Sequence, residues 1–353
     1  MARIELRGVS VRFGGVSALE DVSLDVADGQ FFVLLGETGA GKTTTLRLVA
    51  GLEKPDAGRV LIDGRDVTDW GAAERDVAIV LQHYSLYPRY TVRQNLEFPL
   101  KSPIRATPPA EIAARVARVA KTLRIEHLLD RKTDRLSGGE MQRVSIGRAI
   151  VRTPRAFLMD EPLSALDAKL RETLRAELKD LQMTLGATFL FVTHDQIEAM
   201  SMGDRIGVLD KGRLVQVGTP REIYSDPVST FVARAVGSPA MNLLPGEARG
   251  GRAVIGPDGF ALALEGAPPD RPLIFGIRPE DIALGGAGVP ARVADVENHG
   301  VEQIVTLEAG GHRLRATAPV TQRLVADEIV PLAWVPSKVM VFDGETGRSL
   351  RHG

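Results

Sequence analysis

The chain has 353 residues, with 44 lysines and arginines against 45 aspartates and glutamates, and no cysteine. A hydrophobic share of 44% and a charged share of 25% are typical of a globular protein and exclude a disordered or collagen-like chain. The formal charge of −1 gives no overall attraction to nucleic acid, so we expect no nucleic-acid partner. The lack of thiols excludes disulfides, thiolate zinc sites and cysteine nucleophiles.

The first 240 residues have the pattern of an α/β domain. Residues 1–7 alternate charged with apolar side chains, which predicts an edge strand and not a signal peptide, so we place the chain in the cytoplasm. Apolar runs at 31–35, 157–159 and 189–192 predict strands buried on both faces of a parallel sheet. No apolar run reaches the ~18 residues that a membrane-spanning helix needs.

Helical patterns separate these predicted strands. A cap and two prolines at 107–109 open an amphipathic stretch that we expect to run from about residue 110 to 129. This stretch belongs to a predicted helical subdomain at about 84–150. One further apolar helix face, which we interpret as core packing, is formed by Leu170, Leu174, Leu178, Leu181 and Leu185.

The composition changes near residue 243. The last 110 residues hold 16 of the 36 glycines and 10 of the 21 prolines. Alternating runs at 303–307 and 313–316, with Gly310 and Gly311 between them, predict a hairpin, and residues 339–342 predict a further strand. We therefore expect an α/β domain at 1–240 and a C-terminal all-β, barrel-like domain at 241–353.

One segment has the pattern of a phosphate-binding loop. Residues 36–43 match G-x-x-x-x-G-K-[ST] between an apolar strand and a helical pattern. Backbone N–H groups of such a loop surround phosphate oxygens, and the helix N-terminus adds its positive end. Lys42 would reach the β- and γ-phosphates, and the Thr43 hydroxyl would bind Mg²⁺. The sequence thus predicts a nucleoside triphosphate site rather than a glycine-rich turn. The residues expected at the nucleotide are Gly36, Glu37, Thr38, Gly39, Ala40, Gly41, Lys42, Thr43 and Thr44.

Two further motifs supply charge and hydrogen-bond donors. A predicted strand ends in Asp160 and Glu161, where Asp160 would hold Mg²⁺ and Glu161 would act as general base on the attacking water. An acidic pair alone is a weak indication, but its position after an apolar strand strengthens it. Residues 137–140 precede a helical pattern and fit both a capping box and an anion site at a helix N-terminus. From these residues alone, a well-capped helix that binds nothing is an equal alternative.

These motifs occur in order with Gln82, residues 164–167 and His194. In this order the chain resembles the nucleotide-binding subunit of an ATP-binding cassette (ABC) transporter. The resemblance covers residues 1 to about 240 and implies a P-loop NTPase fold with a mainly parallel sheet and a helical subdomain. Residues 237–242 and 276–280 resemble the junction and the C-terminal oligosaccharide-binding-like (TOBE) domain of carbohydrate importer ATPases of the maltose and glycerol-phosphate type.

The resemblance implies a role for each motif residue in ATP hydrolysis. Glu161 would be the general base, His194 would hydrogen-bond the γ-phosphate, and Phe13 would stack on adenine, although each of the last two, taken alone, is more often structural. Mg²⁺ would be held by Thr43, Gln82 and Asp160, and Gln82 would also act in catalysis by contacting the attacking water. A second subunit, arranged head to tail, would complete the ATP site in trans with Ser137, Gly138, Gly139, Glu140 and Asp167.

The resemblance also implies partners. Two transmembrane permease subunits would contact the region from Gln82 to Tyr90, which holds three of the four tyrosines. Those tyrosines could equally pack the helical subdomain. An extracytoplasmic solute-binding protein would deliver a carbohydrate or related polyol for import. Because both halves of the composite site are intact, we expect a homodimer, also held by the C-terminal domains, peripheral at the cytoplasmic face of the inner or plasma membrane.

The chain departs from the family pattern in two places, and three other classes of ATP-binding protein fit its sequence less well. Glu140 stands where the family usually has Gln, so we expect weaker ATP affinity or a shifted pH profile rather than inactivity. Glu37 and Thr38 replace the commoner Pro-Ser and would contribute only backbone. A DNA-repair ABC ATPase would carry a long coiled coil or zinc hook, a ribosome-acting relative would normally carry two cassettes, and a small-molecule kinase would lack residues 136–140. A C-terminal domain that binds a small ligand or an inhibitory protein stays open.

Overall fold

The computed structural model describes residues 2–103, 107–250, 252–255, 260–265 and 271–352. The chain forms two compact units, Met1–Pro220 and Arg221–Gly353. The sequence placed its boundary at 240/241 instead, after the segment that holds α7 (Pro220–Ser225) and α8 (Thr230–Ala235). The domain limits 1–240 and 241–353 stay a prediction, since compactness does not by itself assign a functional domain.

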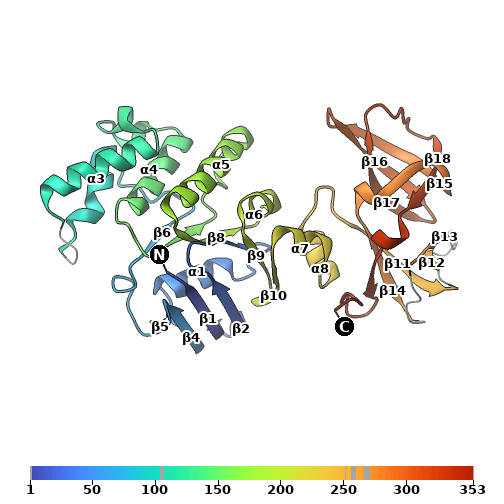
Figure 1. The fold of residues 1–353 in the computed structure, drawn as a ribbon, viewed down its shortest axis with the longest axis horizontal. Coiled ribbons are helices and arrows are strands. Elements are labelled where there is room, and N and C mark those ends of the chain that lie inside the picture. Colours follow the sequence, from blue (N-terminus) through green and yellow to red (C-terminus); the bar gives the residue numbers. More distant parts are fainter. Residues whose placement is uncertain (1, 104–106, 251, 256–259, 266–270, 353) are drawn as a thin grey trace. The chain divides into compact units, whose positions relative to one another are not determined.

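A six-stranded sheet forms the centre of the first unit, in the order β10-β9-β3-β8-β7-β6. Figure 1 labels four of its strands, β6, β8, β9 and β10. All of its pairs are parallel except β9 with β10. The carboxyl ends of parallel strands meet at one edge, so the loops after β3, β7 and β8 come together there. The strands are β3 (Phe31–Leu35), β6 (Val77–Val80), β7 (Ala156–Asp160), β8 (Thr188–Thr193), β9 (Arg205–Asp210) and β10 (Arg213–Gly218).

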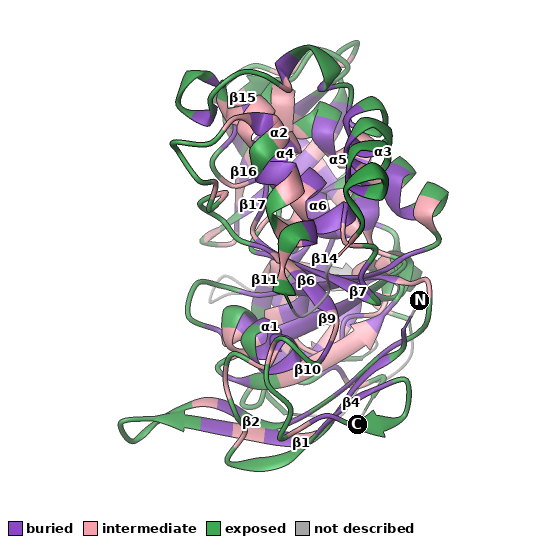
Figure 2. Ribbon diagram, turned by 90° about the vertical axis from the view of Figure 1, so that its left-hand side faces the viewer, coloured by how far each residue is buried: buried purple, intermediate pink, exposed green. Residues whose placement is uncertain are grey.

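The parallel strands are buried on both faces. Every residue of β3, β7 and β8 is buried, and Figure 2 shows β6, β7 and β9 mostly in purple. The rings of Phe31, Phe157 and Phe189 pack in tilted pairs with centroids 4.9 to 5.3 Å apart. This confirms the mainly parallel, doubly covered sheet that the continuous apolar runs predicted.

A four-stranded antiparallel sheet has the order β2-β1-β4-β5. Its strands are β1 (Ile4–Phe13), β2 (Val16–Val26), β4 (Ala57–Ile62) and β5 (Arg65–Asp66). The prediction of an N-terminal edge strand is wrong, because β1 pairs with β2 on one side and with β4 on the other. The alternation of charged and apolar residues indicates that one face of a strand is buried. It does not indicate whether the strand pairs with another strand on one side or on both.

The helices of the first unit include the predicted helical subdomain. They are α1 (Lys42–Ala50), α2 (Val92–Glu97), α3 (Pro109–Thr122), α4 (Gly138–Ile150), α5 (Ala168–Leu185) and α6 (Gln196–Met202). The amphipathic helix expected to reach residue 129 ends at Thr122, because Arg124 takes a left-handed φ of 57° and a 3₁₀ turn follows at Glu126–Leu128. On α5, Leu174, Leu178 and Leu181 are buried, as the leucine spacing predicted. Among the described residues, no helix is long and apolar enough to cross a bilayer.

The second unit contains two antiparallel sheets, ordered β13-β12-β11-β14-β19 and β17-β16-β15-β18. Both sheets contribute to one hydrophobic core that includes Phe275 and Leu332, which confirms the all-β prediction. The predicted hairpin is present, with Ala309 paired to His312 across Gly310 and Gly311, both of which have positive φ. The strands are β11 (Asn242–Arg249), β12 (Arg252–Ile255), β13 (Phe260–Ala263), β14 (Leu273–Ile277), β15 (Ile282–Asn298), β16 (Glu302–Ala309), β17 (His312–Pro319), β18 (Ile329–Trp334) and β19 (Met340–Asp343).

A buried arginine holds α7 and α8 within this second unit. The Arg278 guanidinium is 2% exposed and donates hydrogen bonds to the carbonyls of Tyr224, Ala233 and Val236. It also lies over the Tyr224 ring, 3.9 Å from the centroid. These contacts explain why the compact unit begins before residue 241.

Candidate nucleotide-binding site

The loop between β3 and α1 has a shape that two of its glycines require. A Cβ on Gly36 would lie 2.4 Å from the carbonyl oxygen of Leu209, and one on Gly41 would lie 2.6 Å from that of Ala18. Gly41 is also the N-cap of α1, with a left-handed φ of 104°. The loop is therefore pressed against backbone on its inner side, while Glu37, Thr38 and Gly39 are exposed.

Lys42 is the buried cation at the start of α1. Its side chain is 4% exposed, and its Nζ donates to the carbonyls of Gly36 and Glu37 at 2.9 and 3.0 Å. Nζ also lies 3.4 Å from the Glu161 carboxylate. A buried ammonium with these partners is held at the inner surface of the loop, where the motif places a bound phosphate group.

Thr43 and Asp160 bring two oxygen groups together next to Lys42. The Thr43 hydroxyl donates to Asp160 Oδ1 at 3.0 Å. Burial raises the pKa of the Asp160 carboxyl, and the hydrogen bond from Thr43 acts in the opposite direction. A hydroxyl and a buried carboxylate are hard oxygen ligands of the type that Mg²⁺ prefers, and Mg²⁺ commonly takes its other ligands from waters and substrate phosphates. The donor set therefore fits this ion.

Glu161 lies between Lys42 and His194. Its Oε2 is 2.9 Å from His194 Nδ1, and its Oε1 is the atom nearest Lys42. The backbone of Glu161 has a left-handed φ of 43°, and its N–H donates to the carbonyl of Val192 at the end of β8. Non-glycine residues in this conformation often occur at functional sites, because the surrounding structure must hold them there. The side chain is 17% exposed, so the carboxylate is accessible from one side.

Gln82 joins the same group of residues through Ser164. Gln82 Nε2 donates to Ser164 Oγ at 3.2 Å, and Ser164 Oγ donates to the Glu161 carbonyl at 2.9 Å. The sequence predicts no separate role for Ser164. The spacing of three residues between Glu161 and Ser164 was visible in the sequence. The contact of Ser164 with Gln82, 82 positions away, cannot be predicted from spacing.

The remaining predicted residues lie at element ends. Ser137 caps α4, with Glu140 Oε2 accepting from its backbone N–H at 2.7 Å and from its hydroxyl at 2.9 Å. Asp167 caps α5 by accepting from the N–H of Leu170. These contacts lie within their own helix ends. Direct contacts join the loop to Asp160 and Glu161 and join Glu161 to His194, and Gln82 is linked to Glu161 through Ser164. Gly138 and Thr44 are half-buried and Gly139 is buried.

Phe13 lies at the end of β1 and is 48% exposed. Gly14 and Gly15, both with positive φ, follow it and turn the chain into β2. An exposed phenylalanine at a turn is not part of the hydrophobic core, so its ring is accessible to a stacking partner.

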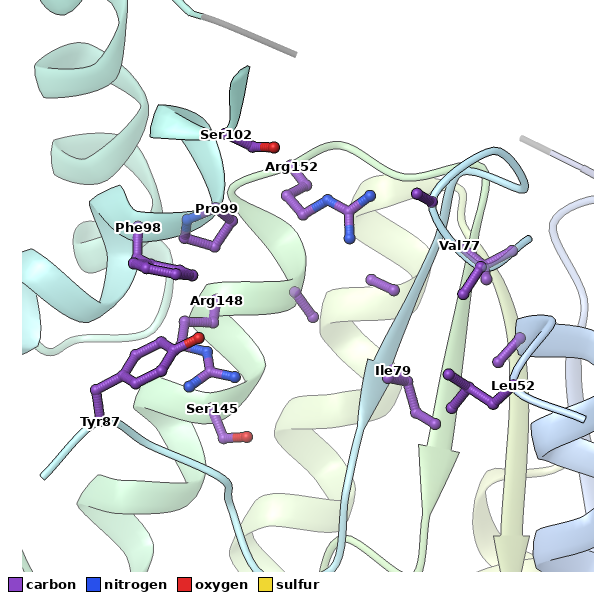
Figure 3. Close-up of a pocket in the computed structure, with 15 residues that line it drawn as sticks. Leu52, Val77, Ile79, Tyr87, Phe98, Pro99, Ser102, Ser145, Arg148 and Arg152 are labelled. Carbon is purple, nitrogen blue, oxygen red and sulfur yellow. The ribbon is translucent and has the colours of Figure 1, made fainter. Parts of the chain in front are cut away.

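A cavity of about 410 Å³ lies in the first unit, close to the loop that follows Gln82 (Figure 3). Tyr87 and Phe98 form one wall, with ring centroids 4.5 Å apart, and Arg148 lies 5.2 Å from the centroid of the Tyr87 ring. The opposite wall is formed by Leu52, Val77 and Ile79. Arg148 and Ser145 of α4 also donate hydrogen bonds to the carbonyls of Ser85 and Tyr84. The cavity thus shares α4 with Ser137, and its lining is continuous with the segment after Gln82.

Comparison with known proteins assigns both units to families. A profile of the ABC transporter family matches residues 19–164. Profiles of the MalK OB fold domain and of the TOBE domain match residues 237–282 and 275–342. The matches lie in the order that the sequence predicted.

Curated relatives match along the whole chain. The trehalose/maltose import ATP-binding protein MalK of Thermococcus litoralis is 46% identical over 376 residues, which cover 99% of this chain and 100% of the relative. The sn-glycerol-3-phosphate import ATP-binding protein UgpC of Rhizobium meliloti is 48% identical over 365 residues, with coverage of 99% and 100%.

Solved structures match the ATPase part. The dimeric ATP-binding cassette MJ0796, in a post-hydrolysis state bound to ADP and Pi, is 33% identical with a TM-score of 0.55, covering 62% of this chain and 99% of that chain. The structure of cbiO1 from Clostridium perfringens, part of the ABC transporter complex cbiONQ, is 28% identical with a TM-score of 0.59, covering 63% and 90%. The chain belongs to the family of ABC transporter ATP-binding proteins, as a cassette followed by OB and TOBE segments.

Proposed function

We propose that this chain is the ATP-hydrolysing subunit of an ABC importer and that two copies form the hydrolysis sites. The observation that carries the proposal is the position of the Glu161 carboxylate, between the buried Lys42 ammonium of the phosphate loop and the imidazole of His194. The phosphate-binding cation and the second γ-phosphate ligand thus each lie within hydrogen-bonding or ion-pairing distance of the base.

The chemistry of each side chain follows from these contacts. Glu161 accepts the proton of the attacking water, and His194 orients the carboxylate and donates to the γ-phosphate. Lys42 exchanges the carbonyls of Gly36 and Glu37 for phosphate oxygens. Thr43, Asp160 and Gln82 would hold Mg²⁺, which would supply positive charge to the phosphate oxygens.

The second copy completes the site. Residues Ser137, Gly138, Gly139 and Glu140 begin the 13-residue helix α4, whose N-terminus supplies N–H donors and a positive dipole end to an anion. In a head-to-tail dimer this end closes over the triphosphate of the partner copy, and Asp167 lies at the contact. This arrangement makes hydrolysis depend on dimer closure, which is the step that drives transport.

The cavity next to Tyr87 is the proposed contact for the two permease subunits. Its aromatic wall, formed by Tyr87 and Phe98, suits an inserted helix, and tyrosine is enriched at such interfaces. An extracytoplasmic binding protein delivers the solute, and the ATPase is peripheral at the cytoplasmic face of the membrane. The relatives named for trehalose/maltose and for sn-glycerol-3-phosphate import suggest a carbohydrate or related polyol derivative.

The test traps the closed state and identifies its partners. Glu161→Gln, with ATP and Mg²⁺, is purified from host membranes, and co-purifying proteins are identified by mass spectrometry. Recovery of two multi-span permeases and a binding protein supports an importer, and ligand screening of that binding protein gives the solute. Recovery of nucleic acid, ribosomes or a soluble partner in their place would refute transport.

A matched pair of variants tests the cavity in the same experiment. Tyr87→Ala removes the ring that packs on Phe98 and Arg148, whereas Tyr87→Phe keeps it. The alanine variant should lose the permeases and keep basal ATP hydrolysis, and the phenylalanine variant should keep both. Loss of nucleotide binding in Tyr87→Ala would count against a role limited to coupling.

A further inference from the structure

The two residues that flank His194 are fixed by side-chain hydrogen bonds. Thr193 Oγ1 donates to the buried carboxylate of Glu198 at 2.6 Å and accepts from the backbone N–H of Asp195 at 3.0 Å. The Asp195 carboxylate caps α6 by accepting from the N–H groups of Ile197 and Glu198. The His194 side chain is 52% exposed, so its position depends on these neighbours more than on its own packing.

Arg171, in the first turn of α5, joins this group to a second segment. Its Nη1 donates to Asp195 Oδ2 at 3.1 Å, and its Nη2 donates to the carbonyl of Leu166 at 3.1 Å. Leu166 stands between Ser164 and Asp167. One guanidinium therefore spans the loop that ends in the proposed dimer contact and the loop that carries His194.

The geometry of arginine makes this bridge specific. The guanidinium presents its N–H donors in a rigid plane, so the two acceptors are held at a fixed separation, which a single ammonium cannot reproduce. The side chains of Arg171 and Asp195 are 30% and 20% exposed, so water screens the pair less than it would an exposed pair.

We propose that Arg171 is a positioning residue for ATP hydrolysis, which fixes the loop that carries His194 relative to residues 164–167 and so keeps the imidazole against Glu161. The inference rests on the proposed function, because it gives Arg171 a role in that same site. It adds a physical connection: a movement of Asp167 on dimer closure is transmitted through Leu166, Arg171 and Asp195 to His194.

The test measures steady-state ATP hydrolysis, equilibrium ATP binding and thermal unfolding of single variants. Arg171→Met keeps the apolar stem and removes both donors, so kcat should fall by about tenfold to hundredfold, as for a small misplacement of a reacting group. The KM for ATP should stay within about twofold, since the phosphate loop is untouched. Arg171→Lys should recover part of kcat. The control is Arg175→Met, one turn further along α5, which should keep the unsubstituted kcat.

A double-variant cycle then tests the bridge itself. Asp195→Asn keeps a good helix cap and removes the charge that Arg171 binds. If the two residues act through one contact, the kcat of the double variant Arg171→Met/Asp195→Asn should be no lower than that of the slower single variant. Independent, multiplicative losses would overturn the proposal.

Two further results would also overturn the proposal. One is an equal loss of kcat in Arg171→Met and Arg175→Met. The other is a raised KM or a lowered unfolding temperature in Arg171→Met with unchanged kcat, which marks a purely structural role. Absence of ATP hydrolysis in the unsubstituted chain would instead refute the proposed function itself, so the two failures are distinguishable.

Discussion

We expect Glu140→Gln to bind ATP more tightly and to be less stable than the unsubstituted chain. The Glu140 carboxylate accepts from the Ser137 backbone N–H at 2.7 Å and from its hydroxyl at 2.9 Å. In the proposed dimer this negative group faces the triphosphate held by the partner copy. Glutamine keeps an acceptor for the cap and removes the charge, so Glu140→Gln separates the capping role from the electrostatic one.

The size of both effects can be estimated from these contacts. A hydrogen bond to a charged acceptor contributes about 1.5–3 kcal/mol and a neutral one about 0.5–1.5 kcal/mol. Because the Glu140 side chain is 29% exposed, we expect the free energy of unfolding to fall by only about 1 kcal/mol, or about 2–4 °C in Tm. Removing one like charge in a wet site is worth about 1 kcal/mol, or about fivefold tighter ATP binding.

The pKa of Glu140 decides how this difference depends on pH. The hydrogen bond from the Ser137 backbone lowers the pKa of Glu140 below its ordinary value of 4.5. A depressed acid pKa gives stability that is present above the unfolded pKa and is lost as pH falls through the folded pKa. The carboxylate therefore stays charged near neutral pH, and the affinity ratio of the two proteins should be constant from about pH 6 to 8. Of the two effects expected from Glu140, this favours a weaker ATP affinity of the unsubstituted chain over a shifted pH profile.

The assay is equilibrium ATP titration at low and high salt, together with thermal unfolding. Glu111→Gln is the control, since Glu111 is a first-turn glutamate of α3, outside the ATP-site motifs. Its ATP affinity should equal that of the unsubstituted chain. An unchanged or weaker ATP affinity of Glu140→Gln at low salt would refute the repulsion, and an unchanged Tm would refute the charged cap.

Three further predictions test other parts of the fold and site. Burial raises the pKa of Asp160, so the charged form is penalised and stability falls as pH rises through the interval between the unfolded pKa and the raised folded pKa. Asp160→Asn removes the buried charge and keeps the acceptor for Thr43, so Tm at neutral pH should rise by about 2–4 °C. The rate of ATP hydrolysis should fall by at least about tenfold. A lower Tm in calorimetry would contradict the penalty on the buried charge. Gly41→Ala places a Cβ 2.6 Å from a backbone carbonyl oxygen and should abolish ATP binding. The Cβ of the control Gly39→Ala would point into open space, so this variant should cost only about 1–2 kcal/mol of backbone strain. Equal losses of ATP affinity in the two glycine variants, measured by nucleotide titration, would be inconsistent with the loop geometry. Arg278→Met leaves three carbonyls without their donor and should lower the unfolding free energy by about 3–5 kcal/mol in denaturant titration. A loss below about 1 kcal/mol would show that water replaces the guanidinium as the hydrogen-bond donor.

Features set by neighbouring residues were predictable from the sequence. The strand before the phosphate loop, the hairpin at Gly310 and Gly311, and the capping box of Ser137 and Glu140 each depend on a few consecutive residues. The roles given to the site residues remain predictions, which the variants above test.

Features set by distant residues were not predictable. The second neighbour of β1 is β4, which begins about 50 positions later, so the edge-strand prediction had no local signal against it. The end of α3 depends on the backbone conformation of Arg124, although the apolar spacing continues beyond it. Ser164 and Arg171 acquire their roles from partners 82 and 24 positions away, which only the folded chain brings into contact.

The composite hydrolysis site is tested most directly by cross-linking its two halves. The chain has no cysteine, so Thr38→Cys and Ser137→Cys in a Glu161→Gln background introduce the only two thiols. With ATP, Mg²⁺ and a short bismaleimide, head-to-tail closure predicts a covalent dimer of twice 38.1 kDa, which an added Lys42→Ala should prevent. Cross-links confined to one chain, or a dimer that forms equally without ATP, would contradict a site shared between two copies.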